Sequence, residues 1–86
     1  MKHAGAEALD AIEPLLLQVR LLPGLIEKKR GIFYRKSKAF LHFHEDAAGM
    51  FADIKLSGDG DFVRLRVSTA AERKAVVIAA KKAVAP

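Results

Sequence analysis

The chain contains no cysteine, so disulfide bonds, thiolate chemistry and cysteine-based metal sites are all excluded. No apolar run approaches the ~18 residues that a membrane-spanning helix needs, and the first residues carry no apolar signal core. We therefore expect a cytoplasmic protein that does not bind membranes. Repeats and low-complexity linkers are also missing, which predicts one domain over residues 1–86.

What is present is the composition of a folded domain with a basic surface. Hydrophobic residues make up 51% of the chain and charged residues 29%, which argues against a disordered chain. Lysine and arginine number 15 against 10 aspartates and glutamates, which gives a net charge of +5. This charge increases solubility and mildly favours an anionic partner.

Hydrophobic alternation predicts four strands. Three of them lie within residues 31–56 and the fourth covers residues 62–67. The clearest alternation sets Ala39, Leu41 and Phe43 on one face, with Phe40, His42 and His44 on the other. Period-2 alternation is typical of a strand that buries one face on a core.

Two tight turns, at residues 37–38 and 47–48, determine the register we expect. A slip by one residue would turn every side chain to the opposite face, so burial selects one register. The expected pairs are Phe33 with His42 and Tyr34 with Leu41 in the first hairpin, then His42 with Asp53, His44 with Phe51 and Leu41 with Ile54 in the second.

A helix is predicted over residues 11–22. Asp10 and Glu13 resemble an N-terminal capping box, in which each side chain accepts from a backbone N–H of the first turn. Pro23 and Gly24 end the helix, because proline cannot continue it and glycine can adopt the left-handed closing position.

A second helix is predicted over about residues 70–84. It begins at a second capping box, formed by Thr69 and Glu72. Of the remaining segments, residues 1–9 are expected to be frayed and disordered, and residues 27–30 to be a solvated charged connector.

The element order is therefore α-β-β-β-β-α. Short turns between strands favour an antiparallel meander, and two amphipathic helices need a sheet face to cover. The predicted fold is a two-layer α+β sandwich in which a four-stranded antiparallel sheet carries both helices on one face. The other face of the sheet is then open.

The segment GIFYRKSKAFLHFHEDAAGMFADIKL, followed by STAAER, resembles a family of small bacterial domains of unknown function. It is also similar to the MmcQ/YjbR domain, which has a CyaY-like α-β sandwich. The resemblance covers about residues 22–80 and rests on Leu22-Pro23-Gly24, on the hairpin of Phe33 and Phe40, and on Ala71-Glu72-Arg73. It implies a DNA-binding role and supplies no catalytic residues.

The open sheet face is where we expect function. Aromatic rings framed by cations are typical of a contact surface and of single-strand binders. The predicted binding residues are Phe33, Arg35, Phe40, His42, His44, Phe51, Asp53, Lys55, Arg64 and Arg66, with Phe62 beside them. They predict a small non-enzymatic binding domain that uses this face, with a homodimer interface as one occupant. The alternative is a nucleic-acid-binding domain.

A second alternative is a metal- or acid–base-dependent enzyme. His42 is expected opposite Asp53, with Arg64 or Arg66 beside it, and a carboxylate can orient an imidazole and raise its pKa. No nucleophilic side chain is placed nearby, and such cross-strand charges also stabilise ordinary sheets.

A metal site is a further possibility on the same strand. His42 and His44 share one face, and Glu45 or Asp46 could add a carboxylate. Two histidines are too few for a structural zinc site, which needs four ligands. We therefore predict no catalytic residue, metal or cofactor.

Overall fold

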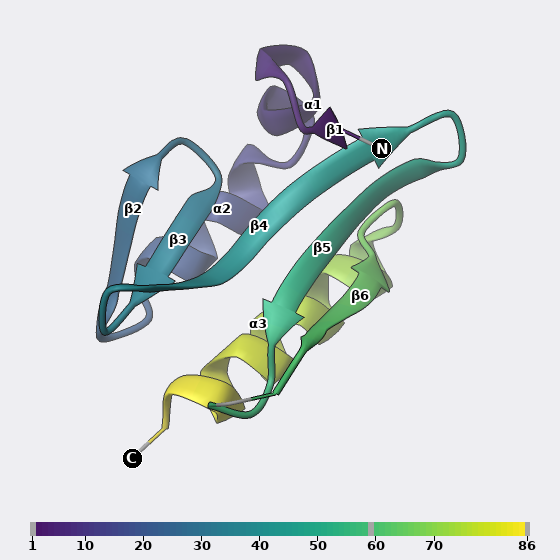
Figure 1. Ribbon diagram of the computed structural model, residues 1–86. Coiled ribbons are helices and arrows are strands. Elements are labelled where there is room, and N and C mark those ends of the chain that lie inside the picture. The colour runs from purple at the N-terminus through teal and green to yellow at the C-terminus, as the bar shows by residue number, and fades with distance from the viewer. Residues whose placement is uncertain (1, 59, 86) are drawn as a thin grey trace.

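The computed structural model describes residues 2–58 and 60–85. Helices and strands are mixed, and the sheet is antiparallel (Figure 1). The elements are β1 (Lys2–His3), α1 (Ala6–Ala11), α2 (Glu13–Arg20), β2 (Leu25–Lys29), β3 (Ile32–Arg35), β4 (Lys38–Asp46), β5 (Gly49–Lys55), β6 (Phe62–Arg66) and α3 (Ala70–Val84). The α+β prediction is confirmed, but the sheet is larger than predicted.

The sheet runs in the order β2-β3-β4-β5-β6, and β1 pairs with β4 outside that path. The prediction of four strands is therefore wrong, because two segments expected to be irregular are strands. β1 lies beside the later part of β4, pairing with Glu45 and His44, while β3 pairs with the earlier part. Two strands thus share one edge of β4.

β2 was expected to be a charged connector. Its charges do not prevent pairing, because the inward Glu27 is fully engaged by neighbours. Its carboxylate accepts two hydrogen bonds from Arg20, at 2.6 and 3.0 Å, and one from the Gly31 N–H at 2.8 Å. A polar group facing the core side is tolerated when it is hydrogen-bonded in this way.

The N-terminal segment was expected to be frayed, and over residues 2–9 this is wrong. The Ala4 N–H donates to the Phe43 carbonyl at 3.0 Å, and the Gly5 N–H donates to the Glu45 carboxylate at 2.7 Å. Leu9, in α1, is 7% exposed and belongs to the core. Burial of Leu9 and the pairing of β1 with β4 therefore order a segment whose composition alone predicts disorder.

The first predicted helix is shorter in the structure, and a separate helix precedes it. Ile12, with φ −111° and ψ 18°, separates α1 from α2, so the helix expected over 11–22 is Glu13–Arg20. Asp10 does not cap it, because its carboxylate accepts a hydrogen bond from Arg30 at 2.6 Å. The second capping box is confirmed: Thr69 accepts from the Glu72 N–H, and Glu72 accepts from the Thr69 N–H.

The β4–β5 register agrees with the prediction, including His42 opposite Asp53. The β3–β4 register is wrong by two residues next to the turn, where Tyr34 pairs with Ala39 and not with Leu41. The turn is made by Lys36 and Ser37, whose φ values of 51° and 67° fit a hairpin turn with both central residues left-handed. Phe33 faces Leu41 and not His42.

A β-bulge reduces this shift to one residue at Phe33. Phe33 pairs with Leu41 and Tyr34 with Ala39, which leaves Phe40 as an extra residue in β4. Its side chain turns inward with that of Leu41, and Phe40 is only 3% exposed. Simple alternation cannot anticipate an inserted residue.

The core lies between the sheet and the helices. Its largest fully buried side chains come from α2, β3, β4, β5 and α3 and from two connecting residues: Ile12, Leu16, Val19, Phe33, Leu41, Phe43, Ile54, Val67 and Val76. α2 packs on α3, and α3 packs on β5 and β6; Figure 1 shows both helices behind the sheet. Within the described ranges, no helix combines the length and apolar character required to cross a membrane.

Candidate metal site

The outer face is defined here as the strand side chains that alternate with the core residues. Partners in an antiparallel pair share a face, so the pairing of β4, β5 and β6 places most of the predicted binding residues together. They are His42, His44, Phe51, Asp53, Lys55, Arg64 and Arg66, with Phe62 beside them.

Three predicted binding residues do not belong to this face. Phe33 and Phe40 are 1% and 3% exposed and lie in the core. Arg35 turns toward the end of α3, where its guanidinium donates to the Ala83 carbonyl at 2.8 Å. The bulge explains these differences: Phe40 is the inserted residue of β4, and the shift beyond it pairs Phe33 with the inward Leu41, which places Phe33 and Arg35 on the helix side of β3.

The outer face is arranged in rows that run across the strands. One row is Ile32, His42, Asp53 and Arg64, and the next is His3, His44, Phe51 and Arg66. β1 therefore adds a third histidine beside the two that the sequence places on β4. We name His3, His42 and His44 the histidine cluster.

The histidine cluster brings together atoms that bind metals. One ring nitrogen from each residue lies within 4.8 Å of the other two. Nδ1 of His42 and Nε2 of His44 are 2.8 Å apart and form a hydrogen bond. The His3 ring centroid lies 5.5 Å from that of His42 and 4.8 Å from that of His44. Three neutral imidazoles are a recurring ligand set for zinc and related ions.

Asp53 adds a carboxylate at the base of the cluster. It is 6% exposed, and one of its oxygens lies 3.2 Å from Nε2 of His44. Arg64 donates two hydrogen bonds to it, both of 2.8 Å. These bonds are the largest cause that lowers the pKa of Asp53, so the carboxylate is ionised at neutral pH.

Burial lowers the pKa of His42 and that of His44 below the usual value, and for His42 the second cause is the neighbouring His44. Asp53 acts to raise the pKa of His42, as expected, but the loss of hydration outweighs the carboxylate, so the pKa of His42 is lowered. Both rings are neutral at pH 7, the form that binds a metal ion. Nδ1 of His44 is buried and has no well-formed hydrogen bond within residues 2–58 and 60–85.

Sequence reasoning missed His3, because a two-residue strand is too short to show a period and its composition resembles a frayed end. Glu45 and Asp46, suggested as ligands, do not join the cluster. Glu45 accepts from the Gly5 N–H, and Asp46 accepts from the Ala48 N–H at 2.7 Å. Glu45 and Asp46 thus accept hydrogen bonds from backbone N–H groups. The carboxylate beside the imidazoles is that of Asp53, in β5.

The rings of the outer face are each accompanied by a cation. The Lys55 ammonium lies 5.2 Å from the Phe62 ring centre, and the Arg66 guanidinium 5.1 Å from that of Phe51. The Phe62 ring also packs edge-on against His42, at 4.8 Å between centroids. Phe62 thus contacts the histidine cluster directly.

No family model, curated protein or solved structure matches this chain. The similarity to the MmcQ/YjbR domain therefore stays a prediction.

Proposed function

We propose that this chain is a small, non-enzymatic metal-binding domain, with a site for one divalent transition-metal ion at His3, His42 and His44. One observation carries the proposal: three imidazole nitrogens from two strands converge within 4.8 Å. If these three side chains served only for packing, apolar rings could take their place, because apolar rings need no hydrogen-bond partner. In this proposal the helices cover one face of the sheet and the metal site occupies the other.

The ligand set favours zinc or cobalt over magnesium or calcium. Imidazole nitrogen suits zinc and its neighbours in the first transition series, whereas magnesium and calcium prefer oxygen ligands. Asp53 is placed to be the fourth ligand. In a tetrahedral site with bonds of ~2.0–2.1 Å, two ligand atoms are about 3.3 Å apart. The distance of 3.2 Å between Nε2 of His44 and the Asp53 carboxylate already fits this value.

Binding requires three adjustments. The nitrogens of His42 and His44, now 2.8 Å apart, must separate by about 0.5 Å. One of these rings donates the hydrogen bond between them, so it must move its proton to its other nitrogen before both can bind the ion. His3, on the exposed strand β1, must also move closer to the ion.

The test is a titration of chelator-treated protein with zinc by calorimetry, repeated with cobalt by visible absorption. We expect one ion per chain and the absorption of tetrahedral cobalt. Isotope-labelled imidazoles should shift at all three histidines.

Two variants separate the site from general surface binding. His3→Ala should lower zinc affinity by at least the ~10–100-fold loss typical of outer-shell partners, because it removes a ligand. Lys2→Ala is the matched control on the same strand and should bind as the unchanged protein does. Equal affinity in His3→Ala and the control, or no zinc binding at all, would remove the proposal.

The other functions suggested by the sequence gain less support. Acid–base catalysis depended on an imidazole whose pKa Asp53 raises, and the pKa of His42 is lowered instead. Single-strand binding depended on four phenylalanines, of which Phe33 and Phe40 lie in the core. Nucleic-acid binding and homodimer formation stay predictions.

A further inference from the structure

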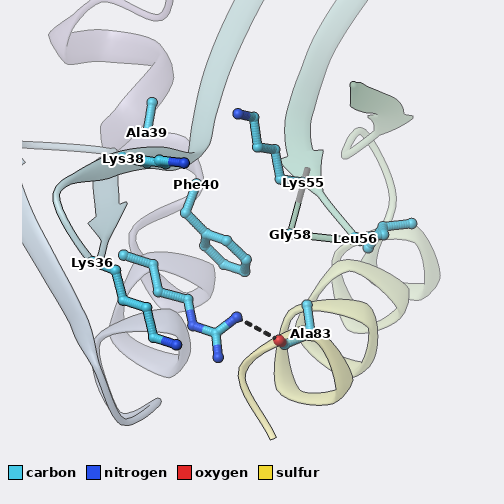
Figure 2. A pocket seen from close by; sticks show the side chains of 9 residues that line it. Lys36, Lys38, Ala39, Phe40, Lys55, Leu56, Gly58 and Ala83 are labelled. Carbon is cyan, nitrogen blue, oxygen red and sulfur yellow. Dashed lines mark hydrogen bonds between the residues drawn. The ribbon is translucent and has the colours of Figure 1, made fainter. Parts of the chain in front are cut away.

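A pocket lies at the opposite end of β4 from the histidine cluster. Its volume is about 240 Å³, and its lining includes Arg35, Lys36, Lys38, Phe40, Lys55 and Ala83. The pocket forms where the β4 bulge ends the pairing with β5, since the last paired residues are Leu41 and Ile54. Figure 2 shows the Phe40 ring in the middle of this space, between Lys36 and Leu56.

The charge of this pocket has one sign. Four of its lining residues are cationic, and among the described residues that line it none is acidic. Within the part of the chain that the structure describes, no salt bridge joins Arg35, Lys36, Lys38 or Lys55 to a carboxylate. Cations gathered around a concave, partly apolar space attract an anion.

The end of α3 should oppose an anion, because the last carbonyls of a helix carry partial negative charge. Arg35 offsets this effect directly. Its guanidinium donates to the Ala83 carbonyl at 2.8 Å, the bond drawn as a dashed line in Figure 2. A guanidinium has five donors, so others remain for a ligand.

The turn at the pocket rim is made by residues that do not suit it. Lys36 and Ser37 both have left-handed φ values, of 51° and 67°, which Asn-Gly would adopt at lower cost. Non-glycine residues held in such conformations cluster at functional sites. A lysine at this position costs backbone energy and places a cation on the pocket.

We propose that this pocket binds a small organic anion with a phosphate head group and one flat aromatic ring. The lysines and Arg35 would receive the phosphate, and the ring would pack against Phe40. At ~30 Å³ per water, the volume equals about eight waters, which suits one ring with its head group. The site is separate from the histidine cluster and does not depend on metal binding.

The probe is phenyl phosphate, titrated into chelator-treated protein at low salt and followed by backbone amide NMR. We expect saturable shifts at Arg35, Lys38, Phe40 and Lys55, with an affinity that falls as salt increases. Inorganic phosphate should bind about three- to tenfold more weakly, because it lacks the aromatic contact. Equal affinity for inorganic phosphate would overturn the aromatic part of the assignment.

Lys36→Asn is the sharpest variant. Asparagine suits the left-handed turn, so the thermal midpoint should be unchanged or higher, while affinity falls by about twofold to fivefold. Lys55→Gln should lower affinity by a similar factor from the opposite strand. Lys29→Gln makes the same change of net charge at the far end of β2 and should leave affinity unchanged. An equal loss in all three, or no shifts with phenyl phosphate, would overturn the proposal.

Discussion

At the scale of single residues, Gly31 lies close against Leu9 of the N-terminal helix. Its φ is +80°, and a Cβ there would lie 2.7 Å from Cδ2 of Leu9. Leu9 is 7% exposed, so its side chain has little room to move. Gly24 has nearly the same φ, +79°, but nothing within 4 Å of a Cβ position. The two glycines therefore share a backbone requirement and differ in packing.

We expect Gly31→Ala to lower the free energy of unfolding more than Gly24→Ala. Gly24→Ala should cost about 1–2 kcal/mol, the penalty of left-handed backbone with a Cβ. Gly31→Ala should add about 1–3 kcal/mol from displacing Leu9. Urea unfolding of both variants measures the difference. Equal losses would mean that Leu9 moves aside freely.

The sequence predicted most residues of the outer face, but it did not predict on which face of the sheet the side chains of β3 lie. His42, Asp53 and Arg64 meet as expected, because the β4–β5 hairpin keeps strict alternation. Phe40 does not, because a bulge inserts one residue and no hydrophobic pattern marks it. Alternation locates a strand reliably, but its faces are correct only up to the first irregularity.

At the scale of elements, ionic hydrogen bonds attach β2 to α2. Arg20 of α2 holds Glu27, and the Gly31 N–H also donates to it. The Arg20 hydrogen bonds are the largest cause that lowers the pKa of Glu27 from 4.5. A carboxyl group whose pKa is lower in the folded state stabilises the fold above its unfolded pKa, and this stabilisation is lost as the pH falls through the folded value.

Glu27→Gln should therefore reduce the free energy of unfolding by about 1 kcal/mol at pH 7. The difference from the unchanged protein should shrink as the pH falls from 4.5 through the lower pKa of the folded state, below which both proteins carry a neutral side chain. Urea unfolding between pH 7 and 3 measures it. Glu7→Gln, in exposed α1, is the control and should have little effect at any pH. A difference independent of pH would contradict the ionic explanation.

The elements that the sequence predicted are those that alternate or carry their own caps. α3 begins at Thr69 as expected because its capping box is local, needing only residues of one turn. β2 was missed because its inward Glu27 depends on Arg20 of another element. β1 was missed because its two residues contain no pattern. An element that is stabilised by partners distant in sequence cannot be recognised from the pattern of its own residues.

At the scale of the whole molecule, β4 connects everything that we propose to have a function. Its first residue lines the anion pocket, and its later residues carry His42 and His44. Both proposed sites lie where β4 has an irregular neighbour: the bulge beside β3 at one end, and the short β1 at the other. The candidate sites could not be derived from the sequence for this reason, since each depends on an irregularity.

The attachment of β1 also bears on the order in which the chain folds. β3, β4, β5 and β6 meet neighbours in sequence, whereas the Gly5 N–H meets Glu45 across 40 residues. Closing that loop costs more conformational entropy than closing a hairpin. In exchange it forms only two residue pairs between β1 and β4. We expect β1 to dock last, so pulsed hydrogen exchange during refolding should protect β5 before Ala4 and Gly5; simultaneous protection would contradict this. A metal ion would then bind a finished fold, unlike the ion of a zinc finger, which organises an unfolded chain.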